Sequence, residues 1–229
     1  MNILTLETST KGFSLALSKD QKVVTYRNFK SDQVLSSSII PAIARILKQG
    51  RLSLGKLDGL AVGLGPGSFT SLRVGLATVK GLVFSLQIPV VGISSLDSVA
   101  YAIPASSPSG EADICVATDA RRGLVYACFY QKKKSELVRK SDYLLVKIDE
   151  MIDRIKAKTV IAGDALSLYK DEIAKRKKGR VIFTEEKYWR PQARYLVPLA
   201  LQRFEENDYD DANRLVPIYL YPDDCQVQR

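Results

Sequence analysis

The chain has 229 residues and a formal net charge of +9; 46% of its residues are hydrophobic and 26% are charged, a balance that argues against extensive disorder. It contains no histidine, which excludes Ser-His-Asp and Cys-His catalytic sets and any imidazole metal ligand. The cysteines are far apart and form no C-x-x-C pair, so neither a zinc site nor a redox site is predicted; they are Cys115, Cys128 and Cys225.

The N-terminus shows no basic region before an apolar stretch, and the most apolar segment, residues 81–93, is shorter than a membrane span. We therefore expect a soluble protein of the cytoplasm. Cys115 and Cys128 both lie in apolar runs, and we expect them to be small buried side chains.

Apolar periodicity predicts an ordered series of elements in the first hundred residues. Strands are expected at 2–7, 13–17, 23–29, 57–64 and 89–93. Helices are expected at 33–49, 70–86 and 94–102. Pro41 lies inside the first of these helices and should kink it. The resulting order is β-β-β-α-β-α-β-α.

A Pro/Ser/Gly-rich linker, residues 104–110, separates this series from a looser repetition of it. The expected strands are 113–119, 124–131, 143–146, 159–162 and 180–183, and the expected helices are 147–155, 167–175 and 191–206. Two related α/β halves indicate the actin-like ATPase (ribonuclease H-like) fold. We predict halves at 1–103 and 111–229, with a C-terminal tail able to pack back on the first half. A single doubly wound sheet is the alternative.

The glycine-rich segment Gly63–Thr70 connects a predicted strand to a predicted helix. A helix start approached by glycines exposes backbone N–H groups that can hold an anion. The segment matches neither the P-loop nor the G-x-G-x-x-G pattern, so a plain tight connection is the alternative. The candidate anion or nucleotide contacts are Gly65, Gly67 and Ser68 with Glu7, Thr8 and Ser9 at the end of the first strand.

Two predicted helices carry a second face of small, mildly polar side chains. Small residues allow another helix to approach closely, so this face predicts a partner interface; ordinary solvent exposure is the alternative. The candidate interface residues are Val34, Ser38, Ala42 and Arg45 in the first helix and Ser71, Gly75, Thr78 and Leu82 in the second. The basic runs 132–134 and 175–178 are expected to be solvated tips, with tRNA or phosphate contact as the alternative.

The block Gly65–Gly81 (GPGSFTSLRVGLATVKG), followed by Ile88–Leu96 (IPVVGISSL), resembles the signature of the TsaB family of bacterial tRNA threonylcarbamoyladenosine biosynthesis proteins. Weaker landmarks of the family are matched by Glu7–Thr10, Asp119–Gly123, Gly163–Asp164 and Pro217–Leu220. Ser71 stands where the family usually has glycine, and Leu35 where many members have histidine. These departures remove no known catalytic group.

The resemblance implies an actin-like fold and a non-catalytic scaffold role. The catalytic relative, TsaD, binds a metal through two histidines, and the corresponding positions here are Ser95 and Val99. Similar proteins pair with TsaD through their first two helices, and TsaE joins as an ATPase. The complex transfers a threonylcarbamoyl group to the adenosine beside the anticodon of tRNAs that read codons starting with A. The resemblance further implies a homodimer through the same surface when the protein is alone. ATP or ADP is a candidate ligand at the partner interface. The chain is expected to contact tRNA only as part of the complex.

Other functions stay open on the residues alone. A free-standing actin-fold ATPase or small-molecule kinase would need an acidic site, for which Glu7, Asp119 and Asp164 are the candidates. A metallopeptidase is disfavoured by the lack of histidine. An RNA-binding module would use the positive net charge.

Overall fold

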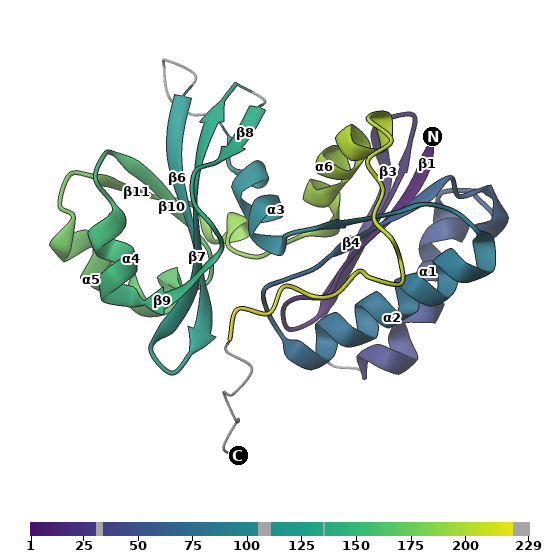
Figure 1. Ribbon diagram of the computed structural model, residues 1–229, viewed down its shortest axis with the longest axis horizontal. Coiled ribbons are helices and arrows are strands. Elements are labelled where there is room, and N and C mark those ends of the chain that lie inside the picture. The colour runs from purple at the N-terminus through teal and green to yellow at the C-terminus, as the bar shows by residue number, and fades with distance from the viewer. Residues whose placement is uncertain (31–33, 105–110, 135, 222–229) are drawn as a thin grey trace. The chain divides into compact units, whose positions relative to one another are not determined.

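The structure is a computed structural model that describes residues 1–30, 34–104, 111–134 and 136–221 (Figure 1). The chain forms two compact units. The first consists of Met1–Ser98 and Pro191–Ile218, and the second of Val99–Arg190 with the residues from Tyr219 on. This division differs from the predicted halves, because a long C-terminal segment belongs to the first unit.

The first unit is built on one mixed sheet with the strand order β3-β2-β1-β4-β5. Its strands are β1 (Asn2–Glu7), β2 (Phe13–Lys19), β3 (Lys22–Phe29), β4 (Gly59–Gly63) and β5 (Val90–Ile93). The β1–β2–β3 strands are antiparallel, whereas β1, β4 and β5 are parallel. The parallel part therefore places the carboxyl ends of β1, β4 and β5 at one edge.

Helices cover both faces of this sheet (Figure 1). They are α1 (Leu35–Gln49) and α2 (Phe69–Leu86) on one face and α6 (Ala193–Glu205) on the other. A short 3-10 turn (Leu54–Lys56) precedes β4, and α3 (Ser95–Ala102) follows β5. Helix α1 runs through Pro41 without interruption. The last helix begins at Ala193, so Pro191 precedes it and does not form its first turn.

Helix α6 packs on the first sheet through an apolar stripe. Leu196 and Val197 join Ile3 and Ala61 in one buried cluster, and the backbone N–H of Ala193 donates a 2.9 Å hydrogen bond to Ser14 Oγ of β2. The sequence spacing that predicted this helix does not say which sheet it covers. Its burial on the first sheet is why the unit boundaries differ from the predicted ones.

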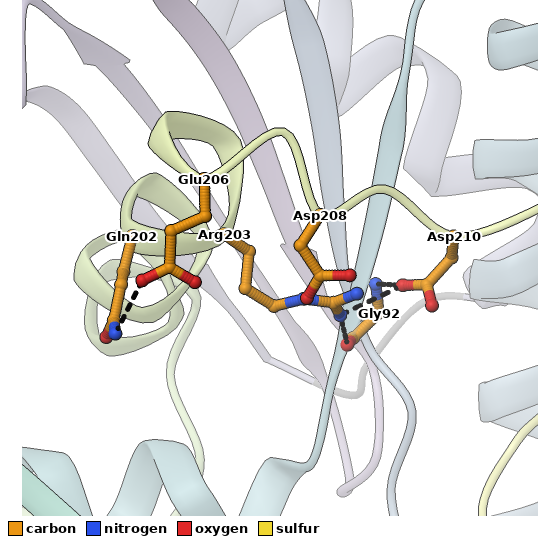
Figure 2. Close-up of polar contacts among 6 residues, drawn as sticks. All are labelled: Gly92, Gln202, Arg203, Glu206, Asp208 and Asp210. Atoms are coloured by element: carbon orange, nitrogen blue, oxygen red, sulfur yellow. Dashed lines mark hydrogen bonds and ion pairs between the residues drawn. The ribbon is translucent and has the colours of Figure 1, made fainter.

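A C-terminal strap, residues 207–218, fastens α6 to the edge strand β5 (Figure 2). Arg203 of α6 donates to Asp208 at 2.6 Å, and to Asp210 and the Gly92 carbonyl at 3.0 Å each. The Gly92 N–H in turn donates to Asp210 at 2.7 Å, and the Asp210 N–H donates to the Val90 carbonyl at 2.9 Å. The strap thus occupies part of the free edge of the sheet, where an unpaired strand would invite another chain.

The second unit repeats the topology of the first. Its strands are β6 (Glu111–Arg121), β7 (Leu124–Lys133), β8 (Glu136–Arg139), β9 (Leu144–Lys147), β10 (Thr159–Ala162) and β11 (Val181–Phe183). Strand β6 is antiparallel to β7 and parallel to β10, which is parallel to β11, and β8 and β9 both pair with β7. This repetition confirms the predicted actin-like (ribonuclease H-like) fold. The alternative of one doubly wound sheet is wrong.

The second sheet is covered by short helices and encloses a smaller core. The helices are α4 (Ile148–Arg154) and α5 (Leu166–Arg176), with a 3-10 turn at Glu186–Tyr188. Cys115 lies against Met151 in this core, with 3.5 Å between their sulfurs. Cys115 and Cys128 are both buried free thiols, as expected; Cys225 lies outside the described residues. Strand β8 was not predicted.

Candidate functional site

A buried carboxyl group lies where β1, β4 and β5 end. Glu7 Oε1 accepts a 2.6 Å hydrogen bond from the Ser9 N–H, and its Oε2 accepts a 2.8 Å bond from the Ser95 hydroxyl. Its carboxyl group lies against Gly63, where any side chain would overlap it. Burial raises the pKa of Glu7 above its usual value, and the hydrogen bonds from Ser9 and Ser95 oppose that rise. The structure thus holds an acidic group in the interior of the first unit.

The Gly65–Pro66–Gly67 turn packs against Ser9 and Ser95, the two residues that donate to this carboxyl group. The Gly65 carbonyl accepts bonds from the Ser95 N–H at 2.8 Å and the Ser94 hydroxyl at 3.2 Å, and its N–H donates to the Ser95 hydroxyl at 3.1 Å. The Ser68 N–H donates a 2.7 Å bond to the Ser9 carbonyl, and Gly67 is packed against Ser9. The turn is therefore hydrogen-bonded within the protein.

The residues predicted to contact an anion are thus brought together, but around an acidic side chain. A phosphate would have to displace the bonds that the Ser9 and Ser68 N–H groups already make, and would lie beside Glu7. A buried carboxyl group disfavours a second anion nearby. This arrangement does not fit a bound phosphate, and we derive no step through a nucleotide at this turn.

Thr8 and Gly75 lie in direct contact. Thr8 is buried, and its hydroxyl makes no hydrogen bond to any residue that the structure describes. A Cβ on Gly75 would overlap the Thr8 hydroxyl, so glycine is needed for the close approach of α2 to the end of β1. Gly75 was predicted to face a partner. It faces the interior of its own unit instead, since helix spacing alone does not show which side of α2 the sheet covers.

The other predicted interface residues lie along the rim of α1 and α2. On α1, Val34 is 71% exposed and Arg45 is exposed, whereas Ser38 is half-buried and Ala42 is buried. The hydroxyl groups of Ser37 and Ser38 both donate 2.9 Å bonds to the Val34 carbonyl, one turn back along the chain, and leave the N–H groups at the start of the helix without a side-chain cap from the described residues.

On α2 the predicted stripe lies at the margin of the exposed side. Ser71, Thr78 and Leu82 are half-buried, and Thr78 donates a 2.9 Å bond to the Val74 carbonyl. The exposed stripe of α2 is shifted from the predicted one and comprises Thr70, Arg73, Ala77, Gly81 and Phe84. The interface role of all these residues stays a prediction.

Helix α2 is apolar, and one side of it is uncovered. By length and composition alone it is apolar enough to cross a membrane, but here it packs on the sheet through Leu76, Val79 and Val83. Only 28% of the residues of α2 are buried. Phe69 and Phe84 are 53% and 47% exposed. An uncovered apolar surface of this kind is typical of a site that another protein covers.

A hollow of about 560 Å³ lies beside the first half of α1. The rings of Phe13 and Phe29 are stacked on one another, with 4.5 Å between their centroids, and both contribute to the lining. The remaining lining residues are Lys30, Val34, Ser37, Ser38, Pro41, Ala42 and Arg45. All four predicted interface residues of α1 therefore border one cavity.

The acidic candidates of the second unit, Asp119 and Asp164, lie next to each other. Asp164 accepts a 3.0 Å bond from the Asp119 N–H. Burial raises the pKa of Asp164; the Asp119 carboxylate also raises it, whereas Arg190 lowers it. In the part of the chain that the structure describes, no three Cys, Asp or Glu side chains gather to hold a metal ion.

The two basic runs are not simple solvated tips. Lys132 is buried and its Nζ donates to the carbonyls of Tyr101 and Ile103 at 2.7 and 2.6 Å, so it closes the end of α3. Burial lowers the pKa of Lys132. In the second run, Arg176 forms ion pairs with Asp149 and Asp153 on α4. These contacts join distant segments, which spacing in the sequence does not reveal.

Comparison with known proteins places these features in a family. The family described as "TsaD: tRNA N6-adenosine threonylcarbamoyltransferase" matches residues 31–224. The chain is 28% identical to the tRNA threonylcarbamoyladenosine biosynthesis protein TsaB of Escherichia coli, over 96% of this chain and 94% of that protein. It is 30% identical to the protein of the same name from Bacillus subtilis, over 76% of this chain and 75% of that protein.

Solved structures agree with these matches. A crystal structure of an uncharacterized Pseudomonas aeruginosa protein with similarity to the peptidase YeaZ gives a TM-score of 0.81 at 25% identity. The structure of YeaZ from Pseudomonas aeruginosa gives 0.78 at 26% identity. Each match covers 96% of this chain and 99% of the other, so the similarity includes residues of both units.

Proposed function

We propose a function from one premise: this chain belongs to the TsaB family of tRNA threonylcarbamoyladenosine biosynthesis proteins. Within that pathway it is a non-catalytic subunit that binds the TsaD-type catalytic subunit and supports its activity. The observation that carries the proposal is the pair of exposed rings, Phe69 and Phe84, on the uncovered side of α2, next to helix α1 and the hollow that α1 borders.

The buried polar cluster supports a non-catalytic role. A catalytic acid must reach its substrate, but Glu7 is 2% exposed and its oxygens are engaged by Ser9 and Ser95. The sequence contains no histidine that could serve as a base or metal ligand. These features favour a scaffold over a free-standing ATPase, kinase or metallopeptidase.

The proposed complex also contains a TsaE-type ATPase and acts in the cytoplasm. It transfers a threonylcarbamoyl group to the adenosine beside the anticodon of tRNAs that read codons starting with A. This chain holds the catalytic subunit in its active state and meets tRNA only as part of the complex. ATP or ADP would enter at the interface between subunits, since Gly65 is already hydrogen-bonded to Ser94 and Ser95.

Two glycine variants test the proposed surface. Gly81 on α2 and Gly55 outside both helices are exposed, and a side chain at either would meet open space. Gly81→Trp should therefore leave the chain folded but weaken binding to the TsaD-type subunit of the same organism by about tenfold or more. Gly55→Trp is the matched control and should bind normally. Light scattering of the mixture, with and without ATP, measures the complex.

Two results would contradict the proposal. The first is a wild-type chain that neither binds the TsaD-type subunit nor changes the amount of modified tRNA. The second is ATP turnover by the isolated chain, which would favour a free-standing ATPase.

A further inference from the structure

Two basic segments of the second unit meet at one edge of its sheet (Figure 1). Residues 154–158 run from the end of α4 into β10, and residues 175–180 run from the end of α5 into β11. The two strands are parallel, with Thr159 opposite Val181, and the Thr159 N–H donates a 2.9 Å hydrogen bond to the Arg180 carbonyl. The amino ends of both strands therefore lie together, and so do the segments that precede them.

This strand pairing concentrates positive charge. Residues 154–158 carry three cations and residues 175–180 carry five, and neither segment contains an acid. Two of these cations have structural roles: Arg176 is held by carboxylates of α4, and the Lys177 Nζ donates a 3.0 Å hydrogen bond to the Ile155 carbonyl. The others are exposed and make no side-chain hydrogen bond or ion pair with any residue that the structure describes; they are Arg154, Lys156, Lys158, Lys175, Lys178 and Arg180.

The carboxylates beside this edge do not balance its charge. Arg176 pairs with Asp149 and Asp153 of α4. It also lies 3.7 Å from Glu172 of its own helix, so one cation engages all three acids. On the neighbouring strand β6, Asp113 lies beside the start of β10 and is half-buried. The cations of the two segments therefore outnumber the carboxylates next to them.

Helix ends explain only part of this charge. Cations in the last turn of a helix are favoured by the helix dipole. That effect accounts for Arg154 at the end of α4 and for Lys175 in the last turn of α5. It does not account for the exposed cations of the two connections, which lie beyond the helices and are Lys156, Lys158, Lys178 and Arg180.

The side chains between the cations indicate the class of partner. Ala157 and Gly179 are exposed but small, and Ile155 is buried in the core. A stable protein–protein interface needs an apolar centre that excludes water, and a membrane-binding surface needs apolar side chains that enter the lipid. The two segments provide neither. Exposed lysines and arginines without an apolar centre suit a phosphodiester backbone, which is bound mainly through its charge.

We propose that these two segments contact the phosphate backbone of an RNA; the name basic edge is used below for residues 154–158 and 175–180. The inference rests on the proposed function for the identity of that RNA, because the proposed complex modifies tRNA. Phosphate contacts position a nucleic acid without reading its sequence. Their strength falls steeply with salt, so at cellular salt the basic edge acts only once the complex has brought tRNA close.

The experiment measures binding of the full chain to a labelled tRNA that reads codons starting with A, at about 50 and about 200 mM salt. The test variant changes the three exposed lysines of the connections together, as Lys156→Gln, Lys158→Gln and Lys178→Gln. The control variant removes the same charge from exposed positions of the first unit, as Lys11→Gln, Lys22→Gln and Lys56→Gln. Exposed substitutions of this kind should leave both variants folded, which circular dichroism checks.

We expect the wild type to bind this tRNA at the lower salt and to lose most of its affinity at the higher salt. The test variant should raise Kd at the lower salt by about tenfold or more. It should also reduce the slope of log K against log salt by roughly one for each lysine that contacts a phosphate. The control should change Kd by less than about threefold. In a mixture with the TsaD-type subunit, the test variant should bind that subunit normally but hold tRNA less tightly.

The alternative outcomes separate this inference from the proposed function. Equal effects of the test and control variants, or no tRNA binding at about 50 mM salt, contradict the basic edge and leave the proposed function intact. Tighter binding through the same lysines to vesicles of phosphatidylserine and phosphatidylcholine than to tRNA would make a membrane the partner and overturn the inference. If the chain binds tRNA through these lysines but binds no TsaD-type subunit, the proposed function fails and the basic edge stands.

Discussion

The carboxyl group of Glu7 accepts a 2.8 Å hydrogen bond from the hydroxyl of Ser95, which joins the end of β1 to the first residue of α3. The residue is buried, and the bonds it makes come from neutral groups, Ser9 and Ser95. A buried acid without a cationic partner is costly in its ionised form. The site therefore links the stability of the first unit to pH.

Glu7→Gln should stabilise the protein at neutral pH. The folded state raises the pKa of Glu7 above its ordinary 4.5, so it binds the proton more tightly than the unfolded state does. The stability that this proton contributes is complete below pH 4.5 and is lost as pH rises through the folded pKa. Glutamine keeps a neutral group there. In urea at pH 7, the free energy of unfolding of the variant should exceed that of the wild type by more than about 0.5 kcal/mol.

The matched control for this substitution is Asp171→Asn on the exposed side of α5. It should change the free energy of unfolding little at any pH. If Glu7→Gln retained the wild-type decline of stability above pH 4.5, the buried carboxyl group would not be its cause.

Two glycines of α2 should respond oppositely to alanine. Gly75→Ala should destabilise the chain by about 1–3 kcal/mol, because the new methyl group would overlap the Thr8 hydroxyl. Gly81→Ala should stabilise it by up to about 1 kcal/mol, because alanine favours the helix and nothing obstructs the methyl group. Thermal unfolding of both variants measures the difference. Equal effects would show that Gly75 is not packed as described.

Lys132→Met should destabilise the second unit. It removes the donor from the Tyr101 and Ile103 carbonyls, and a buried acceptor without a partner costs about 1–3 kcal/mol. Lys134→Met, in the same basic run but exposed, should lie within about 0.5 kcal/mol of the wild type. Urea unfolding followed by circular dichroism provides the comparison. If the run were only a solvated tip, both variants would change the free energy of unfolding by the same small amount.

Arg203→Met should release the strap. Arg203 joins Asp208, Asp210 and the Gly92 carbonyl (Figure 2), and because the ion pairs are partly exposed we expect a loss of only about 1–2 kcal/mol. Limited proteolysis should then cut residues 207–218 faster than in the wild type. Arg214→Met changes an exposed cation of the strap itself and should leave the cleavage rate unchanged. An unchanged rate in Arg203→Met would show that the remaining contacts, among them the Asp210–Val90 and Gly92–Asp210 hydrogen bonds, hold the strap without Arg203.

Local patterns in the chain were sufficient for the order and type of most elements. The spacing of apolar residues in α1, α2 and α5 depends on each helix alone. The alternation in β1 and β6 likewise depends on each strand alone. Strand β8 escaped detection because its four residues, Glu136–Arg139, are half-buried or exposed and show no alternation. The family resemblance was also visible locally, because its longest motif, Gly65–Gly81, is continuous in the chain.

Contacts between distant residues required the folded chain. The stripe of α6 does not reveal that Leu196 packs on the first sheet, and the small side of α2 does not reveal that Gly75 meets Thr8. In the sequence, Lys132 is part of an ordinary basic run. Only the structure shows that its Nζ bonds to the Ile103 carbonyl at the end of α3. Periodicity states which side of an element is apolar, whereas packing decides which neighbour covers it.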